Sequence, residues 1–133
     1  MNPKGAESYE DYYQNDIGRV PDAIRYAIDY APEAFDGYFA SRTAVIRQDG
    51  AALPKRYANL IFAVLDVATG NVVGATNHTR AALEAGCTPD EVVAAFVQTW
   101  LVAGFAATWG KVGWRVLAAL EDEGVLPKRS GHG

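Results

Sequence analysis

The chain has 133 residues, half of them hydrophobic, and a formal net charge of −4 at neutral pH. A chain of this length is expected to form one domain and to bury about 68% of its unfolded surface, so it needs neither disulfides nor a metal to fold. The acidic balance and the scattered basic residues, which form no stripe with interleaved aromatic side chains, argue against a nucleic-acid-binding protein.

The number of cysteines and the length of the apolar runs predict the cellular compartment of the protein. The single cysteine, Cys87, cannot form an internal disulfide, which is typical of a protein in the reducing cytoplasm. The first residues lack the apolar stretch of a signal peptide. The longest run of low charge, residues 92–110, is interrupted by Gln98 and Gly104, and no run approaches the ~20 apolar residues of a membrane span. We therefore expect a cytoplasmic protein with no membrane segment.

Helical signals dominate the chain from its first third onward. Apolar residues recur at three- and four-residue steps, prolines stand at first turns and glycines follow last turns. Strand-like alternation never persists. These patterns predict helices over residues 21–30, 32–47, 53–69 and 72–85, from 89 to a break near Gly104 and Gly110, and over 111–123.

The clearest local signal is Thr88-Pro89-Asp90-Glu91, in which Thr88 and Glu91 can form a capping box and Pro89 suits the first helical position. The turn between the second and third helices is expected at Gln48-Asp49-Gly50.

The predicted fold is all-α, a single-domain helical bundle of about six helices. We assign residues 1–16 to an N-terminal arm, 17–126 to the helical domain and 127–133 to a disordered tail. The tyrosine-rich arm either packs on another subunit or is loosely attached. The apolar surfaces are too extensive for one small bundle, so copies of the chain are expected to associate.

His78 is the candidate for acid–base chemistry. It is the only histidine in the predicted folded body, because His132 falls in the tail, and an imidazole titrates near neutral pH. If the third and fourth helices pack antiparallel, Asn59 or Asp66 approaches His78, and Asn71 lies two turns before it. Two interpretations stay open: a general acid or base, or a buried histidine tied to a neighbouring amide or carboxylate.

Other side chains are weaker candidates. Trp100, with the other two tryptophans, could line an apolar pocket for a ring-bearing ligand, and Gln98 could reach into it; core packing and solvent exposure are the respective alternatives. Cys87 precedes a helix N-terminus, which can lower a thiol pKa, or it simply fills a turn. Too few ligands surround one histidine for a zinc site, and no phosphate-binding glycine loop occurs.

Three motifs between Lys55 and Leu120 resemble the carboxymuconolactone decarboxylase-like superfamily, which includes the alkylhydroperoxidase D-like proteins. The first places a histidine, an alanine and a glycine at four-residue steps, here His78, Ala82 and Gly86. The second is the capped turn Thr88–Val92. The third is Ala103–Ala107, in which an alanine replaces the family's usual proline.

This resemblance implies an all-α protein that assembles as a trimer or hexamer, with sites near subunit contacts. Peroxidase-like members carry a Cys-x-x-Cys pair and a glutamate, whose positions fall on Asn71, Gly74 and Asn59. Only His78 carries over, so thiol peroxidase activity is not expected. The decarboxylase branch also keeps the histidine without the cysteines.

The hypothesis that unites these features is a non-redox decarboxylase or lactone-processing enzyme. It would act on a small carboxylic acid without a cofactor or metal, with His78 as general acid or base and Asn59, Asn71, Gln98 and Trp100 as substrate-binding residues. The alternative is a non-catalytic oligomeric protein that binds a small molecule.

Overall fold

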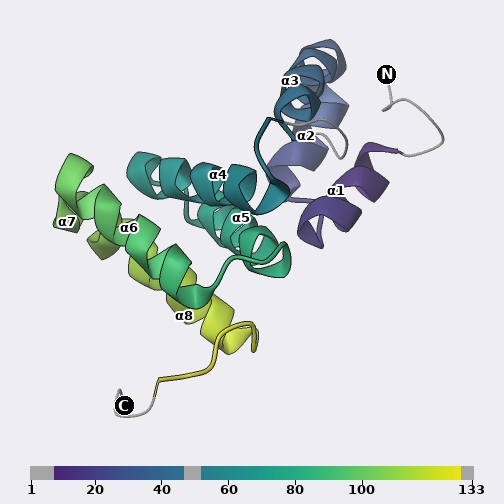
Figure 1. The fold of residues 1–133 in the computed structure, drawn as a ribbon. Helices are drawn as coiled ribbons and strands as arrows, with labels where there is room; N and C mark the ends of the chain where they lie inside the picture. The colour runs from purple at the N-terminus through teal and green to yellow at the C-terminus, as the bar shows by residue number, and fades with distance from the viewer. Residues whose placement is uncertain (1–7, 47–51, 130–133) are drawn as a thin grey trace. The chain divides into compact units, whose positions relative to one another are not determined.

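The computed structural model describes residues 8–46 and 52–129, and the chain divides into two compact units, Met1–Leu53 and Pro54–Gly133 (Figure 1). Within these described residues all regular structure is helical and no strand occurs, which confirms the all-α prediction. The predicted turn at 48–50 and His132 lie outside the described residues. The predicted limits of the arm, the helical domain and the tail stay predictions.

The first unit contains helices α1 (Tyr9–Ile17), α2 (Asp22–Tyr30) and α3 (Pro32–Val45). The tyrosines of α1 pack on the same chain: the Tyr9 ring contacts Phe35 and Phe39 of α3 at centroid distances of 4.9 and 4.8 Å. The pKa of Tyr9 is raised to about 12. Burial is the larger cause, and the hydrogen bond that the Tyr9 hydroxyl donates to Asp36 is the second. The described part of the predicted arm is therefore an ordered helix.

The second unit holds the remaining predicted helices, with boundaries close to those expected. Its elements are α4 (Lys55–Thr69), α5 (Val72–Glu84), α6 (Pro89–Ala103), α7 (Phe105–Thr108), a π-helical segment η1 (Trp109–Gly113) and α8 (Trp114–Asp122).

Helices α4 and α5 form an antiparallel hairpin, because Gly70 ends α4 and Asn71 already caps α5 (Figure 1). Fully buried side chains from α4, α6 and α8, among them Val67, Phe96 and Leu120, make the core of the second unit. The expected capping box begins α6, since the Glu91 amide donates to Thr88 Oγ1 at 3.1 Å and the Thr88 amide donates to Glu91 Oε1 at 2.8 Å.

A two-pronged ion pair fixes α5 at the end of α8. The Arg80 guanidinium donates to both carboxylate oxygens of Glu123 at 2.7 Å. Two parallel charge-assisted bonds define an orientation as well as a distance. The ion pair thereby joins the helix that carries His78 to the end of α8.

The end of α6 differs from the prediction in detail. The expected break occurs at Gly104, whose φ of +93° is rarely accessible to other residues, but Gly110 lies inside η1 rather than between two helices. A π-helical turn holds one more residue than an α-turn and gains its stability from packing, which periodicity does not reveal. Every helix across residues 8–46 and 52–129 is too short or too polar to cross a bilayer.

Candidate functional site

An aspartate–histidine pair joins α4 and α5. Asp66 Oδ2 lies 2.8 Å from His78 Nδ1, and the two side chains keep 20% and 15% of their surface exposed. The antiparallel hairpin brings these residues together, as expected for Asp66 from the sequence. Because a carboxylate only accepts hydrogen bonds, Nδ1 carries the proton and Nε2 is the nitrogen available to another molecule.

Asn71 connects the pair to the start of α5. Its Oδ1 accepts a hydrogen bond from the Gly74 amide at 2.9 Å, which caps the helix, and its Nδ2 lies 3.5 Å from Asp66 Oδ1. One asparagine therefore caps α5 and faces the second oxygen of the carboxylate that holds His78. Asn71 thus contacts Asp66, which in turn contacts His78, and its substrate-binding role stays a prediction.

Gly74 makes this arrangement possible. A Cβ added at position 74 would lie 2.5 Å from Asn71 Nδ2 and 2.8 Å from Asp66 Oδ2, well inside contact distance. The position thus excludes every larger residue unless Asn71 and Asp66 move. The sequence indicated only that a small residue shares the face of His78.

An aromatic side chain restrains the imidazole from the other side. Phe62 lies one turn before Asp66 on α4, and its ring centroid is 5.0 Å from that of His78 at an interplanar angle of 31°. Asp66 fixes the imidazole in its plane while Phe62 packs on its face. Sequence periodicity gave no reason to select Phe62.

The other predicted binding residues occupy different surroundings. Asn59 is fully buried, its Nδ2 donates to the Lys55 carbonyl at 3.0 Å, and its Oδ1 has no partner in the described part of the chain. Gln98 is exposed on α6. Trp100 packs edge-on against Phe105 and Trp109, at 4.9 and 5.2 Å between ring centroids. Their binding roles stay predictions.

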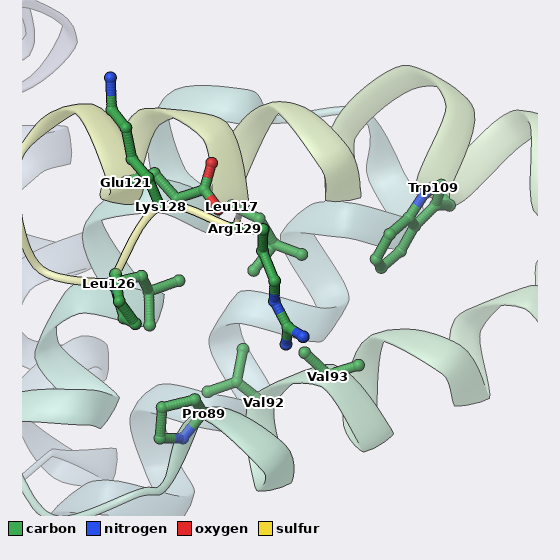
Figure 2. A pocket seen from close by; sticks show the side chains of 10 residues that line it. Pro89, Val92, Val93, Trp109, Leu117, Glu121, Leu126, Lys128 and Arg129 are labelled. Carbon is green, nitrogen blue, oxygen red and sulfur yellow. The ribbon is translucent and has the colours of Figure 1, made fainter. Parts of the chain in front are cut away.

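A cavity of about 640 Å³ lies elsewhere in the second unit, between α6, α8 and the segment that follows α8 (Figure 2). Trp109 lines it, whereas the five predicted site residues do not. Residues 127–129, expected to belong to a disordered tail, form part of its wall.

Cys87 has the opposite environment from the one that activates a thiol. Its side chain is buried and its Sγ donates to the Arg56 carbonyl at 3.5 Å. Burial, reinforced by the nearby Glu91 carboxylate, raises the pKa of the Cys87 thiol, and the opposing effect of Arg56 is smaller. The alternative interpretation, a small residue that fills a turn, agrees with this geometry.

We expect Cys87 to react with a disulfide reagent such as DTNB at least about tenfold more slowly in the native protein than in the denatured chain, because the thiolate is disfavoured and covered. Stopped-flow absorbance in buffer and in guanidinium chloride measures both rates. Equal rates would show that the thiol is open in the native state. The Cys87→Ser variant should show the same residual peroxide consumption as the wild type.

Within residues 8–46 and 52–129, no group of three or more histidine, cysteine, aspartate or glutamate side chains is placed to hold a metal ion. The Asp66–His78 pair supplies at most two ligands, fewer than the three or four of a zinc site. On its own, the pair can donate or accept a proton at one defined position, His78 Nε2.

Comparisons with known proteins bear on this site. The sequence profile of the carboxymuconolactone decarboxylase family matches residues 32–122. A crystal structure from Burkholderia xenovorans LB400, of a protein provisionally assigned as a carboxymuconolactone decarboxylase, is similar to this chain with a TM-score of 0.79 and 36% sequence identity. That match covers 92% of this chain and 94% of the other. Among curated proteins, no sequence matches.

Proposed function

This chain belongs to the carboxymuconolactone decarboxylase family, and we propose that it is a decarboxylase or lactone-processing enzyme acting on a small carboxylic acid without a cofactor or a redox step. The observation that carries the proposal is the 2.8 Å contact between Asp66 and His78. It supplies a proton-transfer group of defined tautomer, with one nitrogen held and one available.

In a decarboxylation, the bond between the carboxylate and its neighbouring carbon breaks, and carbon dioxide leaves. The bonding electron pair stays on that carbon and is delocalised into a conjugated carbonyl such as that of a lactone. Protonated His78 then delivers a proton from Nε2 to the carbon and recovers one from water. Asp66 stabilises the imidazolium that precedes this transfer. Positioned acid–base catalysis of this kind contributes about 10²–10⁴ in rate.

The polar neighbours have supporting roles in this proposal. Asn71 positions Asp66, and the unpartnered Oδ1 of Asn59 is an acceptor for a substrate group or a water molecule. Gln98 and Trp100, both on α6, would contact the remainder of the substrate; this assignment rests on the sequence pattern. Thiol peroxidase chemistry is disfavoured, because asparagine and glycine occupy the positions of the family's cysteine pair and Cys87 is buried.

We also propose that the protein works in the cytoplasm as a homo-oligomer, a trimer or hexamer. The exposed apolar side chains at the end of α6 and the start of α7 support association: Leu101, Val102 and Phe105 keep 82%, 89% and 54% of their surface exposed. Exposed apolar side chains gathered in this way mark an interaction face more often than a surface that stays in contact with solvent.

The direct test is to incubate the full chain with carboxymuconolactone in D₂O, with a chelator present and no cofactor added. We expect release of carbon dioxide and one solvent deuterium on the product carbon, followed by mass spectrometry. Saturable binding of lactone acids with neither carbon dioxide nor deuterium uptake would overturn the proposal and favour the non-catalytic binding protein.

A further inference from the structure

The cavity of about 640 Å³ has the size of a ligand site and is not used by the proposed reaction. Small-molecule sites occupy roughly 300–1,000 Å³ and have mainly apolar walls with a few placed polar groups. Here α6 supplies Val92 and Val93, α8 supplies Leu117, and Leu126 closes the side that the C-terminal segment forms (Figure 2). These four aliphatic side chains come from three separate elements.

The end of the cavity formed by Trp109 has an unusual backbone. Trp109 begins the π-helical segment η1, and such segments occur frequently at functional sites. The indole contacts the Trp100 ring edge-on, and it also lies close to Gly113, where an added Cβ would be 3.1 Å from the Trp109 ring. A fixed aromatic surface thus lies at one end of an aliphatic cavity.

The basic residues of the wall differ in direction. Arg129 extends its guanidinium into the cavity between Val92 and Val93, whereas the Lys128 ammonium points away from them (Figure 2). Lys128 pairs with Asp122 at 3.6 Å. Among the described residues no carboxylate pairs with Arg129. The wall thus presents an unpaired guanidinium, a group that binds carboxylates through two parallel hydrogen bonds, within an apolar surface.

We propose that this cavity binds a small organic anion. Its carboxylate pairs with Arg129, and its apolar body lies against Val92, Val93 and Trp109. Glu121 is the acidic residue of the wall, and among the described residues no ion pair joins it to Arg129. This site is separate from the Asp66–His78 pair and does not depend on the reaction proposed for that pair.

The test uses the intrinsic tryptophan fluorescence of the full chain, titrated with 4-phenylbutanoate and with its uncharged amide. We expect a saturable change for the acid and at least about fivefold weaker binding of the amide, the scale of one partly exposed ion pair. A wild-type protein that binds acid and amide equally, or that shows no saturable response to the acid up to millimolar concentration, would overturn the proposal.

Two matched variants locate the carboxylate. Arg129→Gln should weaken binding of the acid about fivefold and leave the amide unchanged, while Lys128→Gln, which removes the same charge from the adjacent position, should bind like the wild type. Equal weakening in both variants would mean that binding of the acid depends on the net charge of the cavity wall and not on Arg129 in particular. A His78→Gln chain should keep its affinity; if it loses the acid, the anion occupies the Asp66–His78 site and the cavity assignment is wrong.

Discussion

The His78→Gln variant is expected to turn over carboxymuconolactone about 10²–10⁴-fold more slowly than the wild type, with little change in thermal stability. A glutamine amide can still donate a hydrogen bond to Asp66, so the contact between α4 and α5 is preserved. What it cannot do is carry a proton to carbon near neutral pH. The turnover number, measured from carbon dioxide release, and the melting curve by circular dichroism separate the chemical effect from a folding defect.

Two further variants sharpen this result. Asp66→Asn keeps the shape of the side chain but lets it donate as well as accept, so His78 no longer has a fixed tautomer; we expect a loss of turnover smaller than that of His78→Gln. Glu84→Gln, which neutralises an exposed acid on the same helix as His78, is the matched control and should be neutral. Unchanged turnover in His78→Gln would assign His78 a packing role.

The approach of Asp66 or Asn59 to His78 could be predicted because it depends on local information. Helical periodicity predicted the two helices, and the short connection through Gly70 and Asn71 favours an antiparallel hairpin. The contacts of Asn59 were harder to predict, because its side-chain amide donates a hydrogen bond to the Lys55 carbonyl one turn earlier. An asparagine side chain forms hydrogen bonds within its own helix as readily as with a neighbouring helix, and sequence spacing does not distinguish the two cases.

The cavity could not be predicted, since it depends on how the chain leaves α8. The amides of Val125 and Leu126 both bond to the Leu120 carbonyl, at 2.9 and 3.1 Å, which turns the chain back along α6 after Gly124. Charge and glycine content at residues 127–133 favoured a tail without fixed structure, and the limits of that tail stay a prediction. Tertiary packing also stabilises η1, whose geometry has no sequence signature of its own.

The Gly74→Ala variant is expected to unfold more easily than the wild type by roughly 1–3 kcal/mol, the usual cost of an extra methyl group in occupied space. Alanine favours helices over glycine by about 1 kcal/mol, so propensity alone predicts the opposite sign. The new methyl group would meet Asn71 Nδ2 and Asp66 Oδ2, and relief of that clash moves the helix cap and the carboxylate together. Urea unfolding followed by circular dichroism gives the stability change.

Gly37→Ala is the matched control, because Gly37 lies within α3 and a Cβ added there meets nothing within 4 Å. We expect it to stabilise the chain by about 0.4–1 kcal/mol and to leave turnover unchanged. Gly74→Ala should lower turnover as well, since Asp66 can no longer hold His78 in one orientation. If both variants gain stability equally, Asn71 and Asp66 rearrange at no cost, and the ordered path from Asn71 through Asp66 to His78 does not restrain the imidazole.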